Sequence, residues 1–301
     1  MKIKSTHILI VLIFFMFFFP LFAFSQNGPD DGKSSIKKKT KPLWEIGLLT
    51  TALRLPHYRG SDEYNIYALP LPYVIYRGKY FQSDRDGFRG IFSKTKNLEA
   101  NLSFYGNPPV NDDNDAREGM EELDPIIEAG PALKWFFMGR HPVKRLYLKP
   151  TFRAVSSIDF SKGMDFDYQG FKTGLSLIYK DNDLLNNDLW RFGVKLGMDF
   201  TNKKYNSYFY DVSREYVNGK RDYYSSNSGY AGFIAAAFLV RKITKDLSLW
   251  SYMGWNNING AVYEDSPLVR QKNNLTVGAS LIWIFSRSKR QVSTKYLDEE
   301  L

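Results

Sequence analysis

The sequence predicts an all-β fold: a transmembrane, antiparallel, up-and-down β-barrel that follows a cleaved signal peptide. Three observations favour this class. The chain is rich in aromatic residues (16%) and yet has a mean hydropathy of −0.37. After residue 25 it contains no apolar run of the roughly 20 residues that a membrane-spanning helix needs. Several segments of about ten residues instead alternate apolar and polar side chains, which is the pattern of a barrel strand that crosses a bilayer.

The N-terminus has the features of a signal peptide. Two lysines lie among the first four residues, and an apolar run follows at 8–24. The small residues Ala23 and Ser25 predict cleavage before Gln26. The alternative is an uncleaved membrane anchor, but the run is interrupted by Pro20 and is shorter than the roughly 20 residues needed to cross the hydrocarbon core. We therefore expect a secreted protein of a Gram-negative envelope.

The chain divides into four predicted parts. They are a signal peptide (1–25), a flexible basic periplasmic leader (26–42), an outer-membrane β-barrel (43–285) and a polar C-terminal tail (286–301). The sequence has no cysteine, which excludes a lipid-acceptor cysteine, disulfides and thiolate metal sites. Much of the net charge of +9 lies near the chain ends, where basic runs are usually solvated tails. We expect contact with outer-membrane lipids and none with nucleic acid, since a secreted chain rarely meets nucleic acid.

The alternation that indicates strands is clearest at 190–200. Even-numbered positions there carry aromatic and aliphatic side chains, and odd-numbered positions carry small or charged ones. The same pattern, with turn signals between, predicts about twelve strands. Their expected ranges are 43–54, 66–77, 79–84, 88–93, 97–105, 126–137, 145–157, 166–179, 189–200, 229–241, 246–256 and 272–285.

Connection lengths support this count. With the N-terminus in the periplasm, twelve strands place the long segments 106–125, 201–228 and 257–271 outside and short turns inside, as barrels of this kind require. If the weak hairpin near Gly87 were one strand, the segment 106–125 would fall on the inner side. Ten strands is the alternative. The segment 229–241 does not alternate, and its length and glycines favour a strand over a short apolar helix.

Three groups of residues carry a resemblance to a known family. The first runs from Tyr58-Arg-Gly-Ser-Asp-Glu63 to Leu69-Pro-Leu-Pro-Tyr73 and Tyr76-Arg-Gly78. The second runs from Asn107-Pro-Pro-Val110 through Arg117-Glu-Gly-Met120 and Leu123 to Gly130-Pro131, and the third is Asp265-Ser-Pro-Leu-Val269. In this order they resemble the MipA/OmpV family of outer-membrane proteins. The positions singled out for an interaction or structural role are Tyr58, Gly60, Ser61, Pro70, Pro72, Tyr73, Arg117, Gly119, Met120, Leu123, Ser266 and Pro267.

The resemblance implies an envelope scaffold. Members are known as MltA-interacting proteins, named for connecting a murein lytic transglycosylase with a murein-synthesising penicillin-binding protein. It therefore implies those two partners, and it implies no enzymatic activity. One departure concerns assembly: such barrels commonly end on an aromatic residue, whereas here Phe285 is followed by 286–301.

The motif residues can also be interpreted physically. Pro70 and Pro72 remove two ladder donors on the same side of a strand, which predicts an irregular segment at a rim or bulge. Gly60 and Ser61 suit a tight turn. Arg117 has acidic neighbours, and we expect charge pairing within its loop.

Basic residues on the polar side of the strands suggest a second functional class. Lys134, Lys149, Arg153, Lys172 and Lys195 face the predicted lumen, where they would favour anions in a small-solute pore. The alternative is that they pair with Glu99, Glu128 and Asp199 and fill the lumen.

Catalytic and metal sites receive little support. An outer-membrane hydrolase is the third candidate function, because His57 lies near Ser61 and Asp62, but the sequence has no nucleophile elbow and no zinc-type histidine pair. His141 falls in a predicted inner turn. The run 111–115 suggests calcium but lacks the glycine and the distal glutamate of an EF-hand loop. We expect no catalytic residues, no metal and no cofactor.

Overall fold

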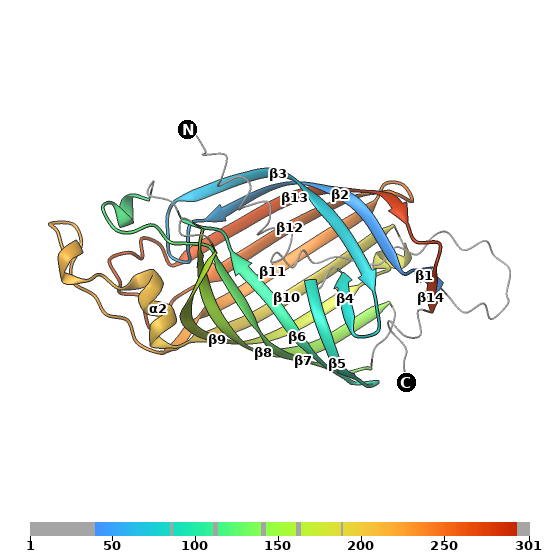
Figure 1. Ribbon diagram of the computed structural model, residues 1–301, viewed down its shortest axis with the longest axis horizontal. Helices are drawn as coiled ribbons and strands as arrows, with labels where there is room; N and C mark the ends of the chain where they lie inside the picture. Colours follow the sequence, from blue (N-terminus) through green and yellow to red (C-terminus); the bar gives the residue numbers. More distant parts are fainter. Residues whose placement is uncertain are drawn as a thin grey trace.

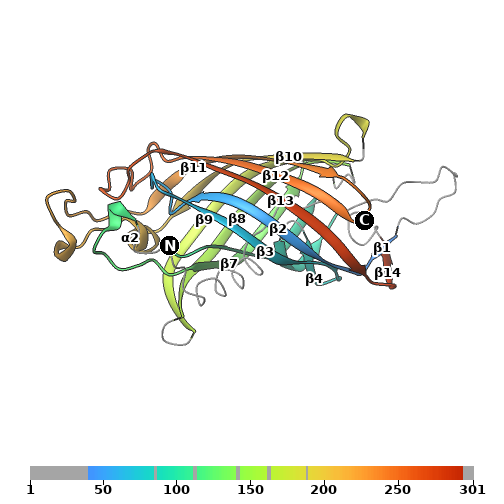
Figure 2. The same ribbon diagram turned by 90° about the horizontal axis from the view of Figure 1, so that it is seen from above.

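Twelve antiparallel strands close into one barrel in the computed structural model (Figures 1 and 2). The structure describes residues 40–293 except 85–86, 111–113, 140–142, 161–163 and 188. The predicted signal peptide and most of the predicted leader therefore lie outside the described residues. Each strand pairs with the next along the chain, and β13 pairs with β2 to close the barrel. The predicted fold class and the count of twelve are confirmed, and the ten-strand alternative is wrong.

The barrel strands are β2 (Trp44–Pro56), β3 (Tyr64–Arg77), β4 (Phe81–Asp84), β5 (Gly87–Lys94), β6 (Leu98–Asn107), β7 (Ile126–Phe136), β8 (Lys144–Asp159), β9 (Asp165–Asp181), β10 (Trp190–Thr201), β11 (Gly229–Lys242), β12 (Leu247–Asn257) and β13 (Asn273–Arg287). The remaining elements are the strands β1 (Thr40–Pro42) and β14 (Gln291–Ser293), the helix α2 (Lys203–Tyr210), and the 3-10 turns η1 (Asp115–Arg117), η2 (Leu184–Asn186) and η3 (Arg214–Tyr216).

The alternating sequence pattern determines which side chains meet lipid. On β10, Leu196 and Phe200 are 43% and 42% exposed, whereas Arg191 and Asp199 are 2% and 7% exposed. The apolar side chains therefore point outward and the charged ones inward. Such a continuous apolar exterior is unfavourable in water and favourable in a bilayer. No helix in the part of the chain that the structure describes is long and apolar enough to cross a membrane.

The prediction of an irregular segment at Pro70 and Pro72 is wrong. Both prolines lie inside the continuous strand β3 and pair in register with Thr50 and Leu48 of β2. The reason is the direction of their nitrogens. Ser83 Oγ of β4 donates to the carbonyl of Val74, 3.0 Å away, so even-numbered residues of β3 direct their backbone polar groups away from β2. A proline at such a position removes no donor from the β2–β3 ladder.

The ladder on the other edge of β3 is short. β3 pairs with β4 at only two positions, Tyr76 with Ser83 and Arg77 with Gln82. β5 in turn pairs with β6 only over Glu99 to Ser103 of β6. Along most of β3 (64–75) and at the end of β6 (104–107), the described residues therefore provide no ladder partner on the facing edges. We call this interrupted part of the barrel wall the β3–β6 seam (Figure 1).

The two ends of the described chain meet beyond the barrel. β1 pairs with β14 in a two-stranded sheet at the end opposite α2 (Figure 1). Arg77 anchors this sheet, because its Nη1 donates to the carbonyl of Pro42 at 2.8 Å and its Nη2 pairs with Glu45. Residues 40–42, which the sequence assigns to a flexible leader, are therefore a strand that pairs with part of the predicted tail.

Candidate functional site

The interior of the barrel has two chemically different halves. The apolar half is a cluster from β2, β3, β11, β12 and β13, which we call the apolar wall. Its buried members are Leu49, Leu53, Leu71, Tyr73, Ile75, Phe238, Val240, Trp250, Ile282 and Ile284. The other half, from β5 to β10, carries charged side chains that are almost fully buried. A lumen of this kind can hold an amphiphilic molecule but offers no uniform polar path.

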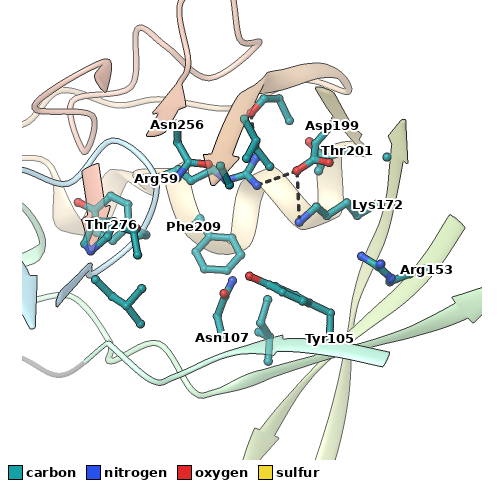
Figure 3. Close-up of a pocket in the computed structure, with 18 of the residues that line it drawn as sticks. Arg59, Tyr105, Asn107, Arg153, Lys172, Asp199, Thr201, Phe209, Asn256 and Thr276 are labelled. Carbon is teal, nitrogen blue, oxygen red and sulfur yellow. Dashed lines mark hydrogen bonds and ion pairs between the residues drawn. The ribbon is translucent and has the colours of Figure 1, made fainter. Parts of the chain in front are cut away.

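A network of ion pairs crosses the charged half. Lys172 Nζ lies 3.4 Å from Asp199 Oδ2 and 3.3 Å from Glu128 Oε1. Arg153 Nη1 lies 3.2 Å from Glu128 Oε2. Arg59 reaches in from the loop between β2 and β3 and donates to Asp199 Oδ2 at 2.7 Å (Figure 3). Each carboxylate thus has two cationic partners, which offsets the cost of burying the charges.

A second ion-pair group lies nearer the inner end of the barrel. Glu99 Oε1 is 3.3 Å from Lys134 Nζ and 3.4 Å from Arg89 Nε, and it accepts from Asn101 Nδ2 at 3.1 Å. Three of the five predicted lumen residues therefore form ion pairs with the carboxylates that the sequence suggested as their partners. These three are Lys134, Arg153 and Lys172.

Between the two halves lies a cavity of about 230 Å³. Tyr205, Phe209 and Tyr210 cover its outer end, and Trp250 and Ile234 line it on the apolar side. Lining residues with a basic side chain are Arg59, Lys149, Arg153, Lys172 and Lys195. The carboxylates of Asp124 and Asp199 line it too, and Glu128 binds two of the lining cations. Basic groups therefore outnumber carboxylates by two.

Two polar groups of the cavity have no partner among the residues that the structure describes. Lys195 makes no hydrogen bond or ion pair with another residue that the structure describes. The indole Nε1–H of Trp250, which is 3% exposed, has no acceptor within the same set of residues. A buried donor without an acceptor costs about 1–3 kcal/mol. Both donors are available to a bound acceptor.

Among the lysines and arginines that line the cavity, Arg59 alone comes from a loop rather than a strand. Burial favours the neutral form of its guanidinium, but the carboxylate of Asp199 acts in the opposite direction and prevails. The pKa of Arg59 is therefore raised well above its ordinary value. This side chain is a permanent cation that connects the first outer loop with the barrel wall.

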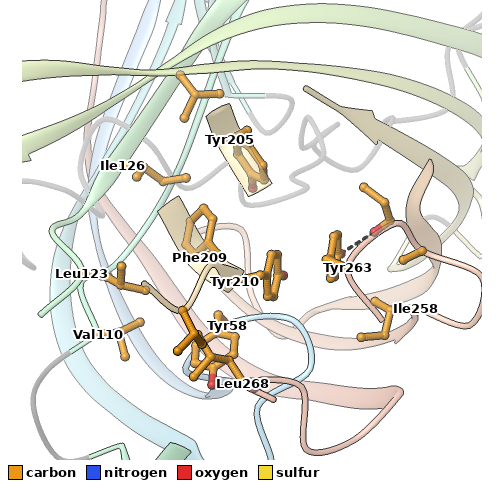
Figure 4. Packing of buried hydrophobic residues seen from close by; sticks show 14 residues of the cluster. Tyr58, Val110, Leu123, Ile126, Tyr205, Phe209, Tyr210, Ile258, Tyr263 and Leu268 are labelled. Carbon is orange, nitrogen blue, oxygen red and sulfur yellow. Dashed lines mark hydrogen bonds between the residues drawn. The ribbon is translucent and has the colours of Figure 1, made fainter. Parts of the chain in front are cut away.

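The motif residues form a cap over the outer end of the barrel. Side chains from the loops between β2 and β3, β6 and β7, β10 and β11, and β12 and β13 pack together (Figure 4). Its buried members are Tyr58, Val110, Leu123, Ile126, Val155, Tyr205, Phe209, Tyr210, Val212, Ala231, Ile258, Ala261, Tyr263 and Leu268. The rings of Tyr210 and Tyr263 stack at 3.8 Å. We call this cluster the cap.

The first motif segment binds the last outer loop. Tyr58 Oη donates to the carbonyl of Leu268 at 2.8 Å, and the backbone N–H of Gly60 donates to Asn274 Oδ1 at 2.7 Å. Gly60 has a φ of +96°, and a Cβ there would lie 3.1 Å from the side chain of Val269. Ser61 is fully buried, and its carbonyl accepts from Asn274 Nδ2 at 2.7 Å.

The second motif segment crosses to α2. Arg117 Nη1 donates to the carbonyl of Phe209 at 3.1 Å and its Nη2 to that of Glu121 at 3.1 Å. The expected charge pairing of Arg117 is absent within the described residues, because its guanidinium satisfies backbone carbonyls instead. Leu123 is a buried member of the cap and Met120 packs against it. Gly119, with a φ of +76°, turns the chain between Arg117 and Met120.

The third motif segment also contacts α2. Ser266 Oγ donates to the carbonyl of Tyr210 at 2.7 Å and accepts from the N–H of Leu268 at 3.2 Å. Pro267 lies between these two residues and is half-buried. The structure thus brings the motif positions of the outer loops together, whereas Pro70, Pro72 and Tyr73 lie on β3, away from the cap.

A hydrolytic site is not assembled around His57. The amide Nδ2 of Asn114 lies 3.1 Å from His57 Nδ1 and donates to Ser61 Oγ at 3.2 Å. The serine and the histidine are therefore bridged by an amide and are not bonded directly within the described residues, as a nucleophile and its base need to be. Ser61 Oγ donates instead to the carbonyl of Glu63 at 3.4 Å. His141 and residues 111–113 of the calcium alternative lie outside the described residues.

Sequence reasoning missed three residues of the cavity. Arg59 lies in a quoted motif, but no pattern indicated that it turns into the lumen. Trp250 could have been found, because Ser248, Trp250 and Tyr252 share the inward parity of β12. Tyr205 lies in a polar loop whose only local signal is Asn202, which caps α2 by accepting from the N–H of Tyr205 at 3.3 Å.

Comparison with known proteins gives one family and several remote barrels. The model of the family described as MltA-interacting protein MipA matches residues 48–285. No curated protein matches the sequence. Similar solved structures include outer membrane phospholipase A from Escherichia coli, with 11% identity over 83% of this chain and 94% of that chain and a TM-score of 0.28. The toluene transporter TodX of Pseudomonas putida has 8% identity over 80% and 88% of the two chains and a TM-score of 0.32. At these values neither likeness bears on function.

Proposed function

We infer function from one premise: the chain belongs to the MltA-interacting protein MipA family, whose model matches residues 48–285. It is an outer-membrane β-barrel protein. We propose that it acts as an envelope scaffold that binds a murein lytic transglycosylase, and through it a murein-synthesising penicillin-binding protein, at the periplasmic side. The observation that carries this proposal is the family's description as MltA-interacting protein.

The geometry supports a binding surface at the periplasmic end. The outer loops are occupied with one another in the cap. At the opposite end, β1 and β14 bring the two ends of the described chain together in a small sheet. The sequence that precedes β1 is basic, with four lysines between positions 33 and 39. A short sheet next to a basic segment offers backbone pairing and charge to a periplasmic partner.

The pore alternative has weaker support. The cation excess of the cavity would favour anions. However, the cap covers the outer end, and the ion pairs of Lys172 and Arg153 cross the charged half. A pore would need both to move.

Co-purification tests the scaffold role. The protein is isolated from detergent-solubilised envelopes and the bound proteins are identified. We expect a lytic transglycosylase to co-purify with the wild type and to be lost when Lys33, Lys37, Lys38 and Lys39 are changed to glutamine. The matched control changes four exposed basic residues of the outer loops, Lys203, Lys204, Arg214 and Lys220, and should retain the partner. Absence of murein enzymes from the wild-type preparation would contradict the proposal.

A further inference from the structure

The cavity has the chemistry of a site for an amphiphilic anion. One side carries the five basic side chains, which exceed the nearby carboxylates by two, and an enclosed excess of positive charge attracts anions. The other side carries Leu55, Ile234, Ala236 and Trp250. A pocket with one apolar wall and a few converging polar groups is typical of a small-molecule site.

We propose that this cavity binds a single-chain amphiphilic anion from the membrane, a fatty acid or a monoacyl phosphate, and that the ligand enters through the β3–β6 seam. The head group accepts from Lys195, and the indole N–H of Trp250 is a second donor in the same cavity. The first part of the ligand's acyl chain lies along the apolar wall. This proposal concerns the lumen and is independent of the scaffold role at the periplasmic end.

The two unpartnered donors support an acceptor in the cavity. Lys195 lies near Arg153, Lys172 and Arg59, and the carboxylate of Asp199 is the opposite charge that acts on it. Arg153 and Lys172 are bound to carboxylates, whereas Lys195 makes no bond to another described residue. An anionic head group would satisfy Lys195 and reduce the repulsion among the cations.

The size of the cavity limits the ligand. The volume of about 230 Å³ lies below the roughly 300–1,000 Å³ of typical ligand pockets. It accommodates a head group and the beginning of one acyl chain, and a two-chain phospholipid is too large. The remainder of a long acyl chain must extend out of the cavity, and we place it in the seam.

The seam adjoins the cavity on its β6 side. Tyr105 and Asn107, at the unpaired end of β6, line the cavity. On the β3 side, Tyr67 and Leu69 pack with Leu55 against the apolar wall. An acyl chain that passes between the two edges would therefore meet the side chains of Tyr67 and Leu69 on the β3 side.

The prolines of β3 fit this role. An open sheet edge in hydrocarbon exposes backbone donors, and each unsatisfied group costs several kcal/mol. Pro70 and Pro72 have no N–H, and their nitrogens face the side of β3 on which the described residues provide no ladder partner. The sequence therefore lowers the cost of leaving this edge open to lipid.

Trp250 provides the reporter for a direct test. The other five tryptophans, Trp44, Trp135, Trp190, Trp255 and Trp283, are changed to phenylalanine, and the barrel is placed in lipid nanodiscs. A brominated fatty acid is added and the quenching of Trp250 fluorescence is measured. We expect saturable quenching, and at least tenfold weaker binding in Lys195→Gln. The matched control Lys245→Gln, in an exposed inner turn, and the charge-preserving Lys195→Arg should bind like the parent.

Three further measurements complete the test: binding of an uncharged ester, competition by inorganic phosphate, and a check that each variant is folded. The methyl ester of the same acid should bind at least tenfold more weakly, because it lacks the charge. Inorganic phosphate should not compete at concentrations that leave the fatty acid bound. Heat-modifiable migration confirms that each variant is folded. Unsaturable quenching, equal binding of the ester, or full protection of Trp250 by phosphate alone would each overturn the proposal, the last by showing a site for small soluble anions.

Discussion

Arg59 and Asp199 are 140 positions apart in the chain and are joined by a hydrogen bond of 2.7 Å. Arg59 belongs to the first outer loop and Asp199 to the inward face of β10. The pair therefore ties the cap to the barrel wall. Because Lys172 shares the same carboxylate, the consequences of losing either partner differ.

We expect Asp199→Asn to destabilise the barrel more than Arg59→Gln. The first change leaves Arg59 without a carboxylate and Lys172 with Glu128 alone, and breaking a buried pair in this way costs about 3–5 kcal/mol. The second leaves Asp199 with Lys172 and removes one charged hydrogen bond, worth about 1.5–3 kcal/mol. Urea unfolding in lipid vesicles measures both. Equal losses, or a double variant whose loss is the sum of the two, would contradict a shared network.

Gly60→Ala should weaken the cap. The residue has a φ of +96° and a Cβ would lie 3.1 Å from Val269, so the substitution adds left-handed strain of about 1–2 kcal/mol to a steric contact. Gly219→Ala is the matched control, because that glycine lies in an outer loop with no atom within 4 Å of an added Cβ. Protease cleavage of the outer loops on intact cells reports the difference. Equal cleavage of the two variants would show that Gly60 is not strained.

Alkaline pH should open the cap before it affects the barrel. Burial raises the pKa of Tyr205 and of Tyr210 above the ordinary value, which is about 10 for tyrosine. The unfolded loops therefore lose these protons first. Their contribution to stability is complete below about pH 10 and is lost as the pH rises from there toward the raised pKa.

Protease sensitivity of the outer loops, measured over a series of pH values, gives the slope of loop stability against pH. Tyr205→Phe removes one ionising group, and the hydroxyl of Tyr205 makes no hydrogen bond within the described residues. We expect this variant to match the wild type at neutral pH and to have a smaller alkaline slope. An unchanged slope would show that Tyr205 ionises freely in the folded state.

The strands were readable from sequence because the bilayer imposes the pattern. A residue such as Phe200 must be apolar where it faces lipid, and its neighbour Asp199 must be polar or small inside the lumen. This requirement is local, so it locates each strand to within a few residues. β11 lacks the alternation because its inward residues Ala236, Phe238 and Val240 face the apolar wall and are apolar too.

The cap and the seam could not be predicted from the sequence, because they depend on contacts between distant segments. Tyr58, Tyr210 and Leu268 meet only when three distant loops close together, and no periodicity records such a contact. The regularity of β3 at Pro70 depends on the shortness of the β3–β4 ladder. Proline in a fully paired strand is irregular, and the sequence does not show that the neighbouring partner is missing.

The intact protein should have a low conductance in planar bilayers, because the cap closes the outer end and ion pairs cross the lumen. Replacing residues 203–226 with a short Gly-Ser linker removes α2 and should raise the conductance with a preference for anions. Lys172→Gln in the same background should reduce that preference. A large, steady conductance of the intact protein would contradict a closed lumen and favour the pore.

Pro70→Ala and Pro72→Ala test the open edge of β3. The restored N–H groups face the seam and find no ladder acceptor among the described residues. Each change then leaves a backbone donor unsatisfied in hydrocarbon and should destabilise the barrel by several kcal/mol. Leu196→Pro is the control, because Leu196 pairs with β9 and β11 on both sides, and a proline there should cost about 3 kcal/mol or more. Stabilisation by either alanine, together with slow hydrogen exchange of its new amide, would show that β3 has a partner on this edge and that the wall is closed.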